Sequence, residues 1–242
     1  MGWPNNYVQG IYNALGSLIG LSDGAGGQIG LAATYTWATK PLASAYVGSA
    51  FISDIGAGTY WVSNGTRWYP LNGRATTYVN PTDYTRAALT SGDTSAAIAA
   101  DDILFTITVE AGMFLDLDLA CLAIDTYHSS NAVAVGYKIY VSSTAGTLGT
   151  LLPIDISVAN YRHYGYHKIQ RLSSSSLRLI GGVGGVEATT GSGLVYASAV
   201  VSAGLPSLDN KFYFQICPYH NGVGANVDET FHYARLDLMN KV

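Results

Sequence analysis

The chain has 242 residues, of which 48% are hydrophobic and only 12% are charged, and its formal net charge is −4. This hydrophobic content is enough for a folded core and excludes wholesale disorder. The negative net charge provides no electrostatic footprint for nucleic acid, so we expect no nucleic-acid partner. A surface with so few charges predicts extensive coverage by partner proteins.

The first 39 residues carry a single charged side chain, Asp23. Apolar residues between Val8 and Ile19 recur at helical spacing and predict one short helix. A surface helix normally has a charged outer face, whereas this one offers only uncharged polar residues. A helix packed on its own domain is one interpretation. We favour an anchor that is buried in a neighbouring protein or among sister copies. Membrane insertion is not expected, because Lys and Arg are missing from the segment. Its candidate docking residues are Trp3, Tyr7, Ile11, Leu15 and Leu18.

A short aromatic stretch from Thr59 to Gly73 predicts a β-hairpin. Asn64-Gly65 is a strong turn signal between two short β-type runs. Pro70 has no N–H to donate and should end the return strand. Alternation places Trp61 on one face and Tyr60 and Val62 on the other, with Trp68 pointing away from Arg67 and Tyr69. The residues of interest in this module are Tyr60, Trp61, Arg67, Trp68 and Tyr69.

The sequence YWVSNGTRWYPLNG, residues 60–73, resembles a short module that recurs in structural proteins of tailed bacteriophages, in tail fibres, spikes and head-attached fibres. There it usually lies between an N-terminal segment that docks on the virion and a distal domain. The resemblance covers only about Phe51 to Gly73 and carries no catalytic residues. It implies a virion protein made in the host cytoplasm, usually a homotrimer, in contact with capsid, collar or tail proteins. Head, collar and tail locations all remain open.

A change in composition suggests the domain boundary. Thr, Ser and Ala dominate from Arg74 to Asp102, which predicts a linker or an extended arm. We therefore expect an anchoring region with the hairpin over 1–74, a linker over 75–102 and a second domain over 103–242.

The second domain has the alternation typical of strands. Ile103 to Val109 and Met113 to Cys121 alternate regularly, and Leu177 to Ile180 forms a short strand that Gly181-Gly182 should stop. Further strand signals follow up to Met239. About eight strands with Gly- and Pro-bearing connections predict an all-β fold with a jelly-roll β-sandwich.

The most unusual polar stretch of the chain is Tyr161 to Lys168. In a strand, His163 and His167 would share one face, and Tyr164 and Tyr166 the other. Aromatic stacking on a host-surface glycan would use such residues, and so would plain subunit packing rich in Tyr. The candidate glycan contacts are Tyr161, His163, Tyr164, Tyr166 and His167. Two imidazoles without nearby carboxylate or thiolate ligands are a weak basis for a metal site, and we predict none.

A catalytic role has little support in the sequence. Asp116 and Asp118 would share a strand face and could serve a polysaccharide-degrading enzyme, but the solvent face of a half-buried strand explains them without further assumptions. Nucleotide-binding, zinc-protease and nucleophile-elbow motifs are absent. We therefore expect a non-enzymatic virion protein without a cofactor, with glycan receptor binding as the alternative. Cys121 and Cys217 are expected to be free buried thiols.

Overall fold

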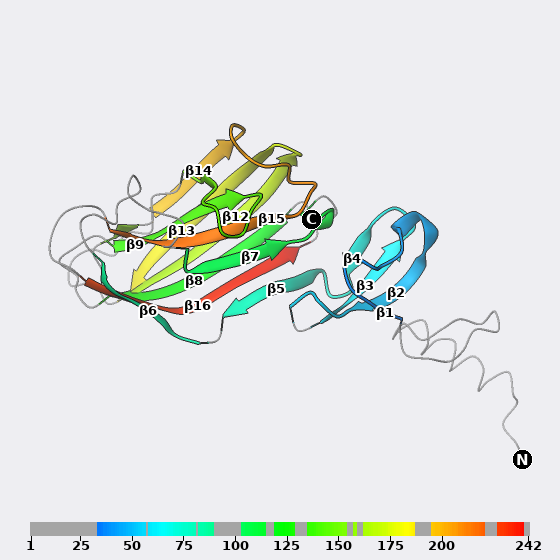
Figure 1. Cartoon of the computed structure of the whole chain (residues 1–242), viewed down its shortest axis with the longest axis horizontal. Coiled ribbons are helices and arrows are strands. Elements are labelled where there is room, and N and C mark those ends of the chain that lie inside the picture. Colours follow the sequence, from blue (N-terminus) through cyan, green and yellow to red (C-terminus); the bar gives the residue numbers. More distant parts are fainter. Residues whose placement is uncertain are drawn as a thin grey trace, which may run out of the picture. The chain divides into compact units, whose positions relative to one another are not determined.

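The computed structural model describes residues 33–56, 58–80, 82–89, 103–114, 119–128, 135–153, 157–158, 162–186, 195–220 and 227–239. The predicted helix near the N-terminus and all five candidate docking residues lie outside these ranges. The chain divides into two compact units, Met1–Ala75 and Thr76–Val242. As expected from the sequence, the described residues form an all-β protein (Figure 1).

The first unit contains a small four-stranded sheet in the order β1-β2-β3-β4. Its strands are β1 (Thr34–Tyr35), β2 (Val47–Ile52), β3 (Thr59–Asn64) and β4 (Trp68–Pro70), with a 3-10 turn η1 at Ala43–Ala45. β1 pairs with β2 in parallel, and the other pairs are antiparallel. The predicted hairpin is therefore confirmed as β3 and β4, and β4 ends at Pro70 as expected.

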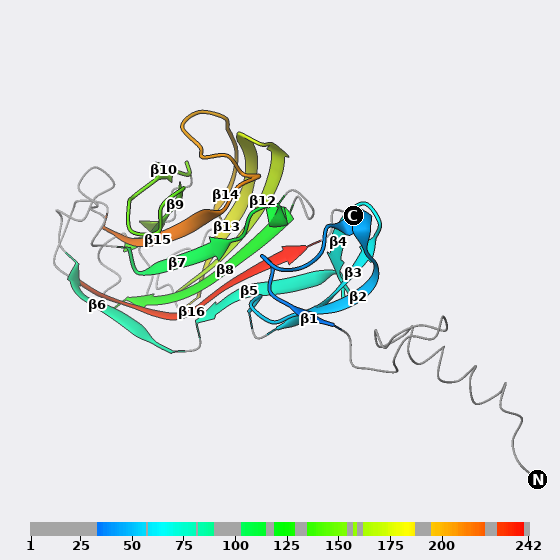
Figure 2. The same cartoon turned by 45° about the vertical axis from the view of Figure 1, so that its right-hand side comes forward.

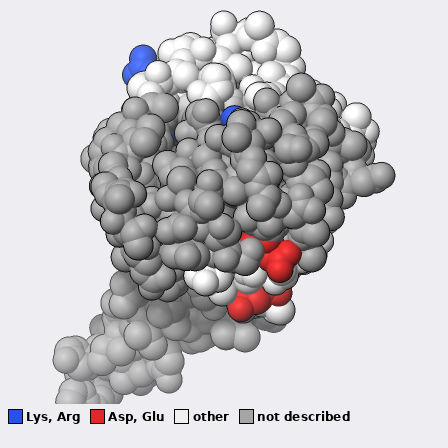
Figure 3. Space-filling view, turned by 90° about the vertical axis from the view of Figure 1, so that its left-hand side faces the viewer, with Lys and Arg blue, Asp and Glu red and all other residues white. Residues whose placement is uncertain are grey.

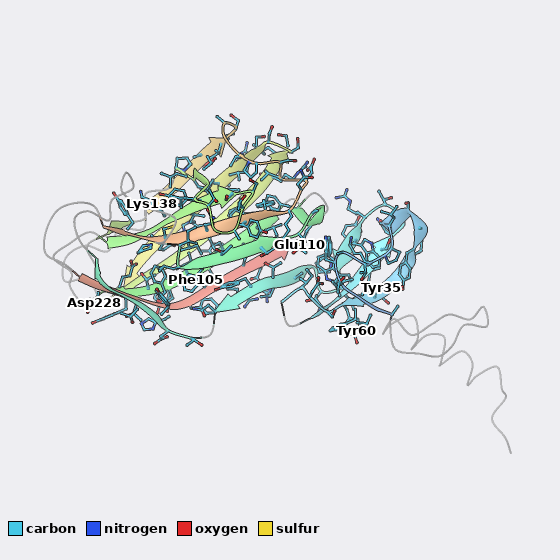
Figure 4. The ribbon with its side chains drawn as sticks, viewed as in Figure 1. Tyr35, Tyr60, Phe105, Glu110, Lys138 and Asp228 are labelled. Atoms are coloured by element: carbon cyan, nitrogen blue, oxygen red, sulfur yellow. The ribbon has the colours of Figure 1, made fainter. Side chains whose placement is uncertain are left out.

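Tryptophan side chains form the core of this unit. Trp61 and Trp68 are fully buried, and the ring of Trp37 packs edge-on against Trp61 with centroids 4.9 Å apart. Trp68 stacks on Tyr46 and donates its indole N–H to the carbonyl of Pro41 at 3.1 Å. On the opposite face of the hairpin Tyr60 is exposed, beside Phe51 (Figure 4). The predicted alternation is therefore confirmed.

The second unit is a β-sandwich. The larger sheet has the order β14-β13-β12-β8-β16-β5, with β6 also paired to β16, and the smaller has the order β10-β9-β15-β7, with β11 paired to β9 (Figure 2). The strands of the larger sheet are β5 (Arg74–Asn80), β6 (Tyr84–Leu89), β8 (Leu119–His128), β12 (Arg162–Ser173), β13 (Ser176–Val186), β14 (Val195–Val201) and β16 (Val227–Met239). Those of the smaller sheet are β7 (Phe105–Val109), β9 (Val135–Ser142), β10 (Thr150–Leu151), β11 (Ser157–Val158) and β15 (Phe212–His220).

Aromatic residues fill the space between the two sheets. Phe105 on β7 packs edge-on against Phe231 on β16, with ring centroids 5.6 Å apart (Figure 4). Tyr137 on β9 reaches the buried His167 on β12. Such interdigitation of two inner faces is the normal way in which a β-sandwich buries its core. Both cysteines are buried and neither forms a disulfide, as expected.

Three expectations about this unit are wrong. The predicted linker over 75–102 contains two strands, β5 and β6, because Arg74–Asn80 and Tyr84–Leu89 join the larger sheet. The predicted strand over Met113 to Cys121 is wrong for its first two residues, because the chain turns at Gly112 (φ +76°) and the adjacent Met113 and Phe114 are both buried instead of alternating. Residues 115–118 lie outside the described ranges, and β8 is described from Leu119.

The third correction concerns Gly181 and Gly182, which do not stop a strand, because β13 runs on to Val186. A side chain at Gly181 would overlap the imidazole of His167. The glycine is thus required by close packing within the sheet and does not indicate a turn.

Candidate functional site: a tyrosine-rich face of the larger sheet

The strand β12 carries most of the predicted glycan contacts. Tyr164 and Tyr166 are 42% and 58% exposed, whereas His167 between the sheets is 0% exposed. The predicted separation of His167 from Tyr164 and Tyr166 is confirmed. His167 is wrong as a glycan contact, because a side chain on the inner face cannot reach a ligand outside the sandwich. His163 lies in β12, but its side chain is not described, and Tyr161 lies outside the described residues.

Three neighbouring strands place their outward residues in register. Tyr164 is opposite Asp125 on β8, which is opposite Tyr233 on β16. In the next row, Ala123 lies between Tyr166 and Arg235, and in the third row Cys121 lies between Lys168 and Asp237. Directly paired residues have Cβ atoms about 4.5–5.5 Å apart. These nine residues form one continuous surface, which we call the outer-face patch.

Charged groups of the patch are held by hydrogen bonds. The Nε atom of Arg235 donates to a carboxylate oxygen of Asp237 at 2.9 Å, and its Nη2 donates to the hydroxyl of Thr76 at 3.2 Å. That hydroxyl in turn donates to the same carboxylate oxygen at 2.6 Å. The hydrogen bond to Asp237, together with one to Tyr233, raises the pKa of Arg235. The guanidinium is therefore oriented before any ligand arrives.

The aromatic side of the patch is also anchored. The hydroxyl of Tyr166 donates to the sulfur of Cys121 at 3.2 Å, and that thiol lies 3.4 Å from the sulfur of Met239. The ring of Tyr166 remains more than half exposed all the same. A tyrosine held at its tip and exposed along its body presents a ring to a partner at little further loss of side-chain entropy.

The sequence could not reveal most of this patch. Asp125, Tyr233 and Arg235 come from strands far apart in the chain, and their meeting depends on the register of β8 with β12 and β16. The only signal in the sequence is the alternation within each strand. It separates outward from inward residues but does not indicate which residue of a neighbouring strand lies opposite.

A second polar cluster lies between the sheets. The hydroxyl of Tyr137 is 2.7 Å from Nε2 of His167, and burial lowers the pKa of His167 from 6.5 to about 4. Burial also raises the pKa of Glu229 on β16 well above its usual value. The pKa of Tyr137 is raised by burial and by the nearby Glu229. All three side chains are closed off from solvent, so they form part of the core.

The described residues contain none of the other sites that the sequence analysis considered. Asp116 and Asp118 lie outside them. Among the described residues no group of three or more His, Cys, Asp or Glu side chains could hold a metal ion, and no helix is long and apolar enough to cross a membrane. Figure 3 shows one end of the sandwich, where the described Lys and Arg atoms are few and a small group of acidic side chains is visible.

Two solved structures show a distant likeness to this chain. No protein-family model matches the sequence, and no curated protein sequence matches it. The fold is similar to part of a bifunctional GH43-CE protein of Bacteroides eggerthii, with a TM-score of 0.33 and 10% identity over 74% of this chain. The match spans only 26% of that protein.

A second solved structure is the CBM2 module of the evolved Dit of Lactobacillus casei BL23 phage J-1, with a TM-score of 0.31 and 8% identity. It covers 57% of this chain and 69% of the module. Likenesses this distant assign neither a family nor a ligand to the chain. The structure itself defines the class: this is an all-β protein with a jelly-roll β-sandwich and a separate small β-module.

Proposed function

We propose that this chain is a non-enzymatic structural protein of a tailed-bacteriophage particle. The observation that carries the proposal is the module at residues 59–73, which resembles a recurrent segment of phage fibres and spikes. Its tryptophans serve as the core of a compact four-stranded unit, and Arg67 lies over the ring of Tyr69 at 5.7 Å. Packing within the unit therefore explains the tryptophans of the module and the position of Arg67, as expected for a connecting element before a distal domain.

The particle itself provides the test. Mass spectrometry of purified virions should find peptides of this chain in proportion to the capsid protein, and antibodies against the sandwich should label one place on the particle in electron micrographs. The site of labelling decides between head, collar and tail. The protein's presence in infected cells but absence from purified particles would contradict the proposal.

The oligomeric state is part of the same proposal. The low charge content suits a chain with large buried interfaces, and the phage proteins that it resembles are usually trimers. Light scattering on the purified full-length protein should give about three times the 25.5 kDa of one chain. The mass of a single chain would exclude the trimer and favour a protein that assembles only on its particle.

The outer-face patch favours a second function, recognition of a glycan on the host surface. Tyr164 and Tyr166 are exposed aromatic residues next to the hydrogen-bonding groups of Asp125 and Arg235, and sugars are bound by this combination of stacking and polar contacts. Binding of the full-length protein to immobilised host polysaccharide should be lost in the double variant Tyr164→Ala/Tyr166→Ala. Tyr84→Ala is a matched control, because this residue is 44% exposed and lies outside the patch. An unchanged binding profile in the double variant would remove the two tyrosines from the site.

A further inference from the structure

The centre of the outer-face patch is its smallest side chain. Ala123 is paired on one side with Tyr166 and on the other with Arg235, and its neighbours along β8 on the same face are Cys121 and Asp125. Although larger residues surround it, Ala123 remains partly exposed. The small side chain of Ala123 is therefore accessible from outside the sandwich, between Tyr166 and Arg235.

We propose that this position binds a single neutral saccharide residue, with Ala123 beneath the ring. The proposal rests on the glycan recognition proposed above and deepens it. Tyr164 and Tyr166 supply aromatic faces on one side of Ala123, and Arg235 supplies N–H donors on the other. Asp125, next to Ala123 on the same face, supplies a carboxylate that accepts hydrogen bonds from sugar hydroxyls. One side chain thus donates and one accepts, as adjacent hydroxyl groups require.

The charges of the patch favour a neutral ligand. Two acidic side chains, Asp125 and Asp237, are balanced by two basic ones, Lys168 and Arg235. The guanidinium of Arg235 is already bonded to Asp237, so little of its positive charge remains uncompensated. Asp125 is only 9% exposed, and a carboxylate in such a site repels an anionic group more strongly than one in water. A uronic or sialic acid placed over Ala123 would meet this carboxylate.

The size of residue 123 determines whether a ring fits. Ala123→Leu adds bulk at the point where the ligand would lie, whereas Ser198→Leu adds a similar side chain on an exposed position of β14 outside the patch. Asp125→Asn keeps the size of the side chain but removes its negative charge. Ala123→Leu thus tests whether the ligand lies over residue 123, and Asp125→Asn tests whether the carboxylate contributes to binding. Ser198→Leu controls for the general effect of an added leucine.

The experiment uses the full-length protein on arrays of neutral hexose and 6-deoxyhexose oligosaccharides, with uronic acid and sialic acid oligosaccharides on the same slide. The thermal unfolding of each variant checks its fold. We expect binding to neutral oligosaccharides, at least about tenfold weaker in Ala123→Leu and several-fold weaker in Asp125→Asn. Ser198→Leu should stay within about twofold of the unmodified protein. If Ala123→Leu fails to fold, Asp125→Asn decides.

The possible results distinguish the two proposals. Undiminished binding by Ala123→Leu would show that a glycan binds elsewhere; if Ala123→Leu does not fold, undiminished binding by Asp125→Asn would show the same. Either result overturns the site over Ala123 but leaves glycan recognition by this protein intact. Preference for the acidic oligosaccharides would overturn the neutral ligand. Absence of binding to every probe by the unmodified protein would refute both the site and the glycan recognition on which it rests.

Discussion

The hydroxyl group of Tyr137 on β9 lies 2.7 Å from Nε2 of His167 on β12, so that one hydrogen bond joins the two sheets across the core. Two glycines make this contact possible. A side chain at Gly165 would overlap the Tyr137 hydroxyl, and one at Gly181 would overlap the imidazole. Because Gly165 and Gly181 lie in long central strands, their lack of a side chain is a requirement of packing.

Gly165→Ala should therefore lower the free energy of unfolding by about 2 kcal/mol or more, since overpacking of a core costs about 1–3 kcal/mol. Denaturant unfolding measures the change. Gly146→Ala is the control, because nothing lies within 4 Å of a side chain added there. If the overlap is the cause, the double variant Gly165→Ala/Tyr137→Phe should lose less than the sum of its single variants. Additive losses would assign the effect to something other than the Tyr137 hydroxyl.

The buried His167 and Glu229 should give opposite dependences of stability on pH. The folded pKa of His167, about 4, lies below its unfolded value near 6.5, so its contribution is present above pH 6.5 and is lost as the pH falls toward 4. The folded pKa of Glu229 is raised, so its contribution is present below about pH 4.5 and is lost as the pH rises. In the unmodified protein the two effects partly cancel.

Single variants separate these effects. In Glu229→Gln the free energy of unfolding should rise between pH 4 and 6.5, by on the order of 3 kcal/mol for the shift of His167. In His167→Gln it should fall as the pH rises above about 4.5. Unfolding curves at half-unit pH intervals give both slopes. Equal slopes in the two variants would show that these residues do not govern the pH dependence.

Sequence reasoning succeeded where the signal was local. Alternation separated Trp61 from Tyr60 in the hairpin, and Tyr164 and Tyr166 from His167 in β12. Asn64-Gly65 correctly marked a tight turn, with Gly65 at φ +85°. In each case a period of two residues, or a single backbone conformation, was enough to decide the outcome.

It failed where the answer depended on distant partners. The segment from Tyr84 to Leu89 was predicted as part of a linker, because its few apolar residues do not mark one buried face of a strand. In the structure it pairs with β16, which lies near the other end of the sequence. Gly181 and Gly182 were predicted to end the strand, because their partners on the neighbouring strand, His167 and Tyr166, cannot be read from the sequence. For the same reason the sequence predicted only the β12 side of the outer-face patch. The position of Ala123 between Tyr166 and Arg235 follows from the strand register, which the sequence does not contain.

The turn of the aromatic hairpin depends on one side chain. Oδ1 of Asn64 accepts hydrogen bonds from the backbone N–H groups of Thr66 and Arg67, at 2.9 and 3.0 Å, and its Nδ2 donates to the hydroxyl of Tyr69. Asn64→Ala should destabilise the hairpin by about 1 kcal/mol, because the exposed backbone groups can turn to water. Hydrogen exchange of the amides of β3 and β4 would measure this.

Two further variants test the explanation for the hairpin. Asn64→Asp keeps the acceptor oxygen and should exchange nearly as slowly as the unmodified protein. Asn72→Ala, in the exposed turn after β4, should have no effect on β3. Fast exchange in Asn64→Asp would mean that the turn is not held by the two bonds to Oδ1.

The triad of Thr76, Arg235 and Asp237 should behave as one unit. Asp237→Ala removes the carboxylate that both other side chains contact and leaves the partly buried guanidinium without this partner, which should cost about 1–3 kcal/mol of unfolding free energy. Thr76→Val removes only the hydroxyl and should cost less. Since both variants break the same Thr76–Asp237 hydrogen bond, the double variant should be more stable than the sum of the single losses predicts, by about 0.5 kcal/mol or more. Chemical denaturation of the four proteins gives this coupling directly, and strict additivity would mean that Thr76 and Asp237 act independently.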